Sequence, residues 1–131
     1  MLKNNFWSWL FSLLPDISPL EKVLISELRL SSDESKTFLL IVKDGKMTPD
    51  RISKALQISL PQALGAADSL VKKGMLIEVS TSQYESLHPR FAASNRYRML
   101  CEQENIEFKK NVKIDNIGVT LQNHYENART K

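Results

Sequence analysis

The segment from Thr48 to Gly74 constrains the fold more than any other part of this sequence, because it contains two consecutive sets of helix boundary signals. Thr48 can cap a first helix, and Pro49 then occupies the first helical position, where a missing N–H group costs nothing. Ser59 and Gln62 have capping-box spacing and begin a second helix, which Gly74 ends. The segment therefore predicts two short helices joined by a tight turn.

The apolar residues of this segment predict how the two helices pack. In the first helix and the turn, the inward side chains are Ile52, Ala55, Leu56 and Ile58. At about 100° per residue, one side of the second helix carries Leu60, Ala63, Leu64, Ala67, Leu70 and Val71. The opposite side carries Gln62, Gly65, Ser69, Lys72 and Lys73. This is the pattern of a helix-turn-helix, in which the outward face of the second helix enters the DNA major groove.

Length and composition limit the remaining possibilities. At 131 residues the chain is long enough for one domain with an appendage, and its 42% apolar and 25% charged residues are typical of a soluble protein. The single cysteine, Cys101, excludes an internal disulfide and fits a reducing cytoplasm. His88 and His124 are isolated, and the sequence contains no phosphate loop or metal-ligand spacing. We expect no enzymatic activity, catalytic residue, cofactor, metal or small-molecule ligand.

Charge is distributed unevenly along the chain. Residues 33–87 carry seven Lys or Arg and seven Asp or Glu, whereas residues 88–131 carry eight basic and five acidic residues. The predicted DNA-reading part is thus neutral, although neutralisation of phosphates supplies most non-specific affinity for DNA. The basic excess lies in the C-terminal part.

The first 17 residues are unusually apolar. Phe6, Trp7, Trp9, Leu10, Phe11, Leu13 and Leu14 crowd into a short segment that ends at Pro15. The segment is too short to span a bilayer and has no signal-peptide cleavage site. We predict an apolar helix that packs on the domain or across a dimer, and insertion into a membrane surface is the alternative.

Two further helices precede the helix-turn-helix. Ser18 and Glu21 form a capping-box pattern with a proline at the first helical position, which predicts a helix to about Arg29. Its apolar stripe is Leu20, Val23, Leu24 and Leu28. Ser31 and Glu34 repeat the capping-box spacing and begin a largely buried helix that ends near Gly45.

After Gly74 the pattern changes to short β-compatible runs. Residues 76–79 and 83–87 flank Ser80, Thr81 and Ser82, and together they predict a hairpin at the position of a wing. Its small, uncharged tip can bond phosphates through hydroxyl groups but adds no electrostatic attraction. A structural hairpin and a DNA-contacting wing both remain open.

The C-terminal part predicts a long helix from Phe91 to about Lys110 that is apolar on two sides. We expect its own domain to cover one side and a second subunit to cover the other. The residues predicted for homodimerisation are Phe91, Tyr97, Leu100 and Phe108. In the alternative, a helix with the stripe Ile114, Ile117, Leu121 and Tyr125 folds back over it. The tail ends in Arg129 and Lys131, which we expect to form a solvated end, with a DNA-binding arm as the alternative.

These elements define a mainly α (α+β) fold. We expect a winged helix-turn-helix with an additional N-terminal apolar helix and a long C-terminal helix. The predicted units are residues 1–17 as the apolar helix, 18–89 as the winged helix-turn-helix domain, and 90–131 as the helical dimerisation segment.

The order of elements in residues 28–89 resembles the winged-helix domain of archaeal TrmB-type transcriptional regulators. The residues that match the family pattern are Leu30, Ser31, Glu34, Gly45, Thr48, Ile52, Leu56, Ile58, Leu70, Gly74, Tyr84 and Pro89. The resemblance covers about half of the chain, and most matches are core, cap or turn positions. Larger family members carry a sugar-binding effector domain, and the roughly forty residues after the hairpin are too few to hold one, so sugar sensing is not expected.

We therefore expect a small, homodimeric, cytoplasmic DNA-binding transcriptional regulator with double-stranded DNA as its partner. Gln62 would pair with an adenine edge and Gly65 would allow close backbone approach, while Ser69 and Lys72 would reach bases or phosphates. The remaining backbone contacts would come from Arg51, Lys54 and Lys73. The alternative is a winged-helix protein-interaction module in a larger complex, with membrane association through the N-terminal segment as a further possibility.

Overall fold

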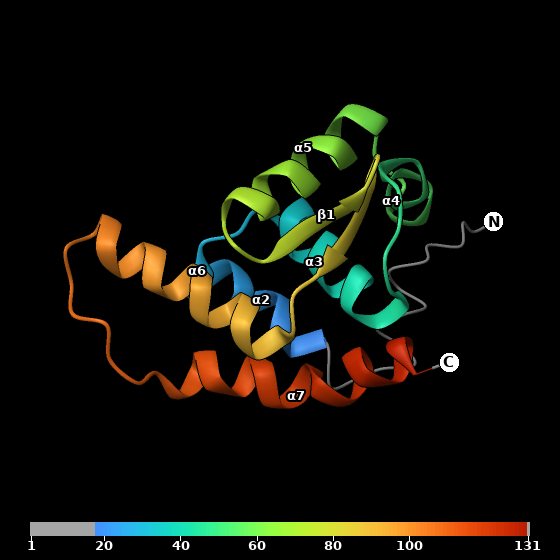
Figure 1. Cartoon of the computed structure of the whole chain (residues 1–131). Helices are drawn as coiled ribbons and strands as arrows, with labels where there is room; N and C mark the ends of the chain where they lie inside the picture. The colour runs from blue at the N-terminus through green and yellow to red at the C-terminus, as the bar shows by residue number, and fades with distance from the viewer. Residues whose placement is uncertain (1–17, 131) are drawn as a thin grey trace.

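The computed structural model describes residues 18–130, which form six helices and one two-stranded antiparallel sheet (Figure 1). In chain order these are α2 (Ser18–Leu28), α3 (Ser32–Asp44), α4 (Pro49–Leu56), α5 (Leu60–Lys72), β1 (Leu76–Ser80), β2 (Gln83–Ser86), α6 (Pro89–Gln103) and α7 (Val112–Arg129). The mostly helical architecture with one small hairpin is consistent with the predicted winged helix. The predicted apolar helix over residues 1–17 lies outside the described residues.

The predicted caps start three of the helices. The Ser31 hydroxyl accepts from the Glu34 N–H, and the Glu34 carboxylate accepts from the Ser31 N–H at 2.7 Å, which completes the capping box of α3. Thr48 caps α4 through the Arg51 N–H, with Pro49 at the first position. Each side chain satisfies a backbone N–H group that has no partner within its helix. These boundaries are confirmed.

Three helices end in the same way, with a Schellman motif. A residue with positive φ follows the helix, and the next N–H group donates to the carbonyl five residues earlier. The positive-φ residues are Gln57 (59°) after α4, Gly74 (79°) after α5 and Asn105 (55°) after α6. The predicted end at Gly74 is confirmed. The end near Asn105 corrects the predicted helix to about Lys110, since an asparagine in the left-handed region stops α6 at Gln103.

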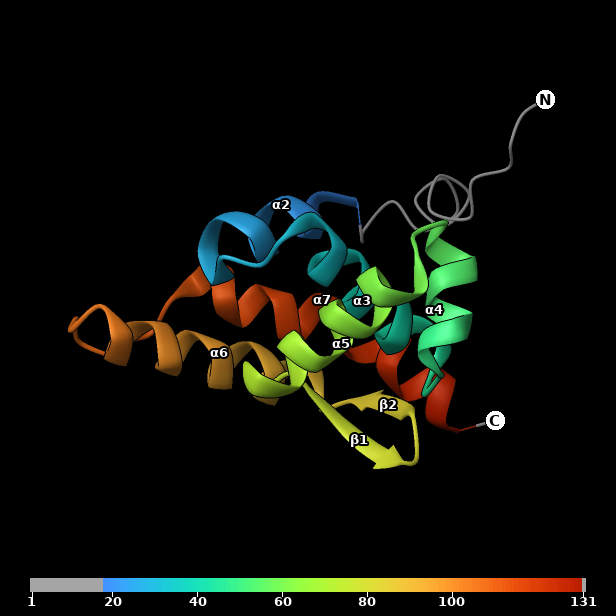
Figure 2. The ribbon, with the colours of Figure 1, turned by 90° about the horizontal axis from the view of Figure 1, so that it is seen from above.

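The hairpin β1–β2 projects away from the helices, as the view from above shows (Figure 2). Leu76 pairs with Ser86, and Glu78 pairs with Tyr84. Met47, in the loop before α4, forms an isolated bridge with Tyr84. Strand β2 is therefore attached to the loop that leads into the helix-turn-helix.

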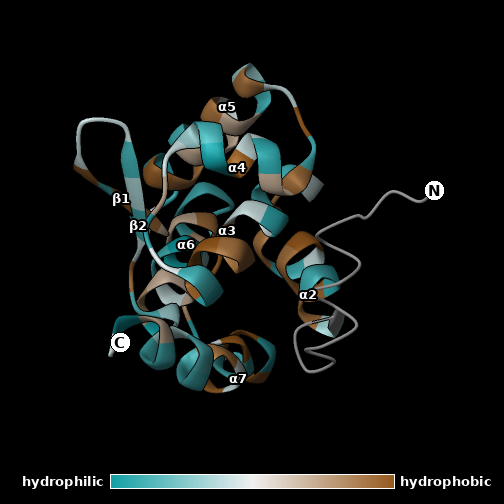
Figure 3. Ribbon diagram, turned by 90° about the vertical axis from the view of Figure 1, so that its right-hand side faces the viewer, coloured by the Kyte–Doolittle hydropathy of each residue, from teal (hydrophilic) through white to brown (hydrophobic). Residues whose placement is uncertain are grey.

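Helix α3 forms the centre of the core. Its residues 38–42 have no exposed surface, because other elements contact the helix on several sides. Helix α5 lies on one side of α3 and α7 on the other, at opposite ends of the molecule in Figures 1 and 3. The buried side chains of both helices, including Leu70 and Leu121, join one continuous core.

Helix α7 folds back along α6, which is the predicted alternative for the C-terminal segment. Three residues of its predicted stripe are buried, since Ile117 and Leu121 are fully covered and Ile114 is 5% exposed, and the fourth, Tyr125, is half-buried against the core. Gly118 of α7 packs tightly against α6, since a Cβ atom there would lie 2.5 Å from Cγ and 3.0 Å from Cα of Arg90. The second apolar side of α6 is thus covered partly within the same chain.

Two arginines, Arg96 and Arg129, have structural roles. Arg96 is 6% exposed and donates to the Leu28 carbonyl at 2.9 Å, which joins α6 to the end of α2. Arg129 donates to the carbonyls of Ile41 and Val42 at 3.1 and 2.6 Å and forms an ion pair with Glu85. The expectation of a solvated end or DNA-binding arm at Arg129 is wrong, because its guanidinium caps the last turn of α3. Lys131 lies outside the described residues.

Candidate nucleic-acid interface

Helices α4 and α5 form the predicted helix-turn-helix, with a turn held by local hydrogen bonds. Gln57 adopts the left-handed conformation, and the Ser53 hydroxyl donates to the Ile58 carbonyl at 2.6 Å. Ser59 then begins α5 with a capping box: its hydroxyl accepts from the Gln62 N–H at 3.1 Å, and its own N–H donates to the Gln62 side-chain oxygen at 2.9 Å. The angle between the helices is therefore set by short-range bonds.

The rotation of α5 differs from the predicted one. Ser69 and Lys73, predicted to face DNA, instead bind the Glu34 carboxylate on α3. The Lys73 ammonium lies 2.9 and 2.7 Å from the two carboxylate oxygens. This corrects the face predicted from helical spacing. The hydrogen bond from Ser69 and the partly buried ion pair of Lys73 turn both side chains toward α3. Helical spacing alone does not reveal such a partner on another helix.

The Glu34 carboxylate also caps α3, so its charge state affects both the start of α3 and the attachment of α5. Burial raises the pKa of Glu34, but hydrogen bonds from Lys73, Ser69 and the Ser31 backbone outweigh burial and lower the pKa below its usual value of 4.5. Glu34 is 6% exposed. It therefore remains ionised at neutral pH and joins the start of α3 to the C-terminal turn of α5.

The face of α5 that remains in solvent is less polar than expected. Leu60 and Leu64, predicted to point inward, are 50% and 43% exposed, and Ala66 is buried in their place. Gly65, Asp68 and Lys72 are also exposed. The rotation toward Glu34 brings the leucines out of the core, so this corrects the predicted inward stripe.

Two of the predicted contact residues near the start of α5 are accessible. Gln62 is exposed, but its oxygen already accepts the Ser59 N–H, which leaves its NH₂ group as a free donor. Gly65 is exposed, and a Cβ atom there would meet nothing within 4 Å. Packing within the described residues therefore does not require glycine at this position.

Positive charge around the helix-turn-helix is largely balanced. Arg51 and Lys54 are exposed on α4, and Lys54 forms an ion pair with Asp50 at 3.2 Å. Lys72 is exposed on α5, where Asp68 is also exposed. Exposed pairs of this kind contribute little to stability, so Lys54 can exchange Asp50 for a phosphate at low cost.

A hydrogen bond joins the hairpin to α5. The buried Tyr84 on β2 donates its phenolic hydrogen to Asp68 at 2.6 Å. This hydrogen bond, with burial and the negative charges of Asp68 and Glu78, raises the pKa of Tyr84 to about 12. At the exposed tip, Glu78 accepts from the Ser82 N–H at 3.2 Å. Spacing along the sequence does not predict the hydrogen bond between Tyr84 and Asp68, because the two residues are 16 positions apart and lie on different elements.

The four residues predicted for dimerisation have different surroundings. Phe91 is 68% exposed, whereas Leu100 is only 7% exposed. The rings of Tyr97 and Phe108 contact each other with centroids 5.5 Å apart, and Arg98 lies over Phe108. The structure therefore does not bring the four residues together into one free surface.

Within residues 18–130, no group of three or more His, Cys, Asp and Glu side chains is arranged to hold a metal ion. None of the helices in the same range has the length and apolar character needed to cross a membrane.

Comparison with known proteins identifies the family. A search of curated proteins and a search of solved structures gave no significant match. The family model described as "Sugar-specific transcriptional regulator TrmB" matches residues 25–99, which is more than half of the chain's 131 residues. The matched range runs from α2 to α6 and contains the whole helix-turn-helix and hairpin. The chain therefore belongs to the TrmB family of transcriptional regulators.

Proposed function

We propose that this chain binds double-stranded DNA as a homodimer, with the N-terminal half of α5 in the major groove. One observation carries this proposal: the first turns of α5 are exposed, and the free Gly65 position allows the DNA to approach the helix closely. The N-terminal residues of the second helix are those that contact base edges in helix-turn-helix proteins.

The contacts follow from the exposed side chains. Gln62 offers its NH₂ group to a base acceptor, and Leu64 offers apolar contact to a thymine methyl group. Phosphate contacts come from Arg51, Lys54 and Lys72. Ser69 and Lys73 act through Glu34 and set the rotation of α5, so they position the helix rather than touch DNA.

The charge balance limits the expected affinity. With three phosphate-binding cations per subunit, the slope of log affinity against log salt is roughly −2 to −3 for each subunit. The hydroxyl-rich hairpin tip adds hydrogen bonds without further charge. We expect weak non-specific binding, and a symmetric site with two half-sites about one helical turn apart should bind more tightly than a single half-site.

Fluorescence anisotropy with random duplex DNA at two salt concentrations tests the proposal. We expect binding at low salt that weakens at higher salt, and Lys72→Gln should make the slope shallower by about one per subunit. Lys109→Gln, at an exposed position in the loop after α6, is the control and should leave the slope unchanged. The absence of binding at low salt overturns the proposal.

A protein-interaction module is the second candidate, and the exposed Leu60 and Leu64 favour it. Apolar side chains on a recognition face suit a protein partner as well as a thymine methyl group. Leu64→Ser separates the two functions. If the protein reads DNA, this change alters base preference at one position of a selected site while the salt slope stays the same. A protein that binds no duplex supports the interaction module.

A further inference from the structure

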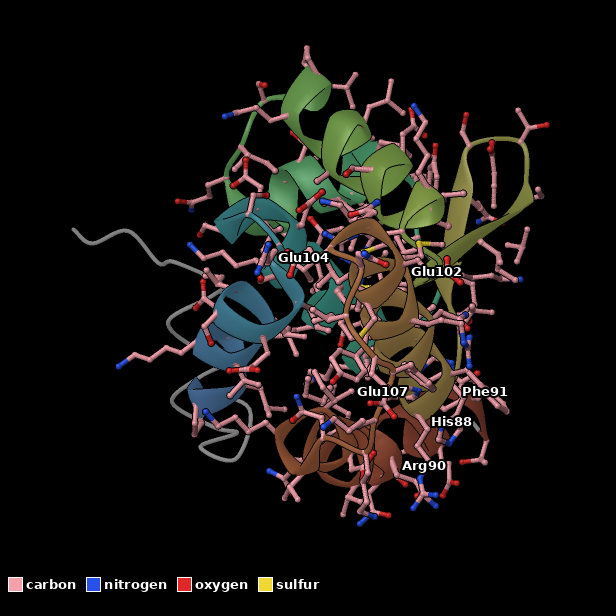
Figure 4. The ribbon with its side chains drawn as sticks, turned by 90° about the vertical axis from the view of Figure 1, so that its left-hand side faces the viewer. His88, Arg90, Phe91, Glu102, Glu104 and Glu107 are labelled. Carbon is pink, nitrogen blue, oxygen red and sulfur yellow. The ribbon has the colours of Figure 1, made fainter. Side chains whose placement is uncertain are left out.

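Phe91 projects from the start of α6 between two hollows. Its side chain is 68% exposed, and Figure 4 shows it with His88 and Arg90 near α7. One hollow, of about 470 Å³, lies between α6 and α7, and the other, of similar volume, opens beside Gln122. A large aromatic ring thus stands beside cavities large enough to receive a ring of the same kind.

The hollow between α6 and α7 combines apolar walls with charges of both signs. Ile114 and Val119 supply apolar surface, and Val119 is 58% exposed. Lys110 and Asp115 lie on its rim as an exposed ion pair at 3.3 Å. Arg90 lines the same hollow, and no carboxylate among residues 18–130 forms an ion pair with it.

From this arrangement we infer that the hollow receives Phe91 of a second copy of this chain. In a two-fold interface the same patch is used by both subunits, so each patch must contain both the projecting group and the cavity that accepts it. Phe91 and the hollow between α6 and α7 meet this requirement, since the ring stands at the edge of the cavity.

The charges of the patch also complement a second copy. Arg90 and Asp115 carry opposite charges and both line the hollow that Phe91 enters, so in the inferred dimer Arg90 of each subunit pairs with Asp115 of the other. Asp115 exchanges its exposed partner Lys110 for this contact at low cost. The interface therefore carries two equivalent charge pairs around two aromatic rings.

The area required for a stable dimer indicates how far the interface extends. Two phenylalanine rings bury roughly 300–500 Å², whereas a specific interface buries at least about 1,000 Å². The remaining area comes from neighbouring exposed apolar residues of α7, of which Val119 is 58% and Val112 73% exposed. Leu100 takes no part, because it is already buried within its own chain.

The surface leaves the proposed DNA contacts free. Helices α5 and α7 lie at opposite ends of the molecule, so a partner on α6 and α7 does not cover α5 (Figures 1 and 3). The inference rests on the homodimer of the proposed function and locates its interface. Dimerisation and DNA binding are measured separately, so either can fail without the other.

Charge reversal tests the interface in the full chain. Light scattering should give the mass of a dimer for the wild type and of a monomer for Phe91→Asp, for Arg90→Glu and for Asp115→Arg. The double variant Arg90→Glu, Asp115→Arg should return to the dimer, because a two-fold axis restores both charge pairs at once. Ile106→Asp is the control: Ile106 is 55% exposed in the loop after α6 and does not line either hollow.

The outcomes separate the possible occupants. A monomeric wild type overturns the inference, and the proposed DNA binding survives if the monomer still binds duplex. A dimer that persists in Phe91→Asp and in both charge reversals also overturns it, since the second copy then sits elsewhere. Circular dichroism confirms that each variant is folded, and a folded monomeric Phe91→Asp supports the inference.

Discussion

Helices α5 and α7 both pack against α3, but they are attached to it by different chemistry. Helix α5 contributes small apolar residues and an ion pair between Lys73 and Glu34. Helix α7 contributes a row of larger aliphatic residues, a glycine at its crossing with α6, and Arg129 at its end. The comparison shows that a partly buried charge determines the rotation of one helix, whereas shape determines that of the other.

The largest expected effect is at the crossing of α6 and α7. Gly118→Leu places a side chain against Arg90, where even a Cβ atom would lie 3.0 Å from backbone Cα. We expect the free energy of unfolding to fall by about 3 kcal/mol. Gly65→Leu, also inside a helix but facing open space, should instead raise stability by about 1 kcal/mol. Urea denaturation measures both; equal effects would mean that shape does not fix α7.

The next effect is at the charge that attaches α5. Glu34→Gln keeps the shape of the side chain but leaves the Lys73 ammonium beside a neutral amide. We expect a loss of about 2 kcal/mol at neutral pH. Asp33→Asn, on the same turn of α3, removes a charge without touching Lys73 and should cost less than about 1 kcal/mol.

The pH dependence of the same pair sharpens this test. The pKa of Glu34 is lower in the folded state than its usual value of 4.5, so its contribution is complete above pH 4.5 and is lost as pH falls through the folded pKa. The difference in unfolding free energy between wild type and Glu34→Gln should therefore shrink in acid. A difference that stays constant from neutral pH to below pH 4 would contradict the ionised state of Glu34.

A smaller effect is expected at the end of α7. Arg129→Met keeps the aliphatic stem but removes the donors to the carbonyls of Ile41 and Val42. We expect a loss of about 1 to 2 kcal/mol and faster hydrogen exchange in the last turns of α7. Arg51→Met, at an exposed site on α4, is the control and should change stability by less than about 0.5 kcal/mol.

The smallest effect concerns the bond between the hairpin and α5. Tyr84→Phe removes the hydrogen bond to Asp68 and should cost about 1 kcal/mol. Because the pKa of Tyr84 is raised to about 12 from its usual value of 10.0, the bond's contribution is complete below pH 10 and is lost as pH rises toward 12. Spectroscopic titration should show a late-ionising tyrosine in the wild type that the variant lacks.

Local signals predicted the helix boundaries well where a cap or a glycine marked them. The capping boxes at Ser31 and Ser59 and the end at Gly74 required only residues three or four positions apart. The end of α6 was missed because asparagine adopts the left-handed conformation less regularly than glycine. The candidate interface was harder to predict. Which face of α5 is exposed depends on the ion pair between Lys73 and Glu34, and these residues are 39 positions apart.

By itself, the sequence determined the order of the elements, most of their boundaries and the apolar stripe of α7, since these depend on short-range hydrogen bonds and helical periodicity. Only the tertiary structure decided the rotation of α5, the return of α7 along α6 and the buried roles of Arg96 and Arg129. The rotation of α5 and the roles of the two arginines depend on long side chains that reach partners far away in the chain, whereas the return of α7 depends on the shape of its crossing with α6. The periodicity of one helix does not predict such partners, because they lie on other elements of the fold.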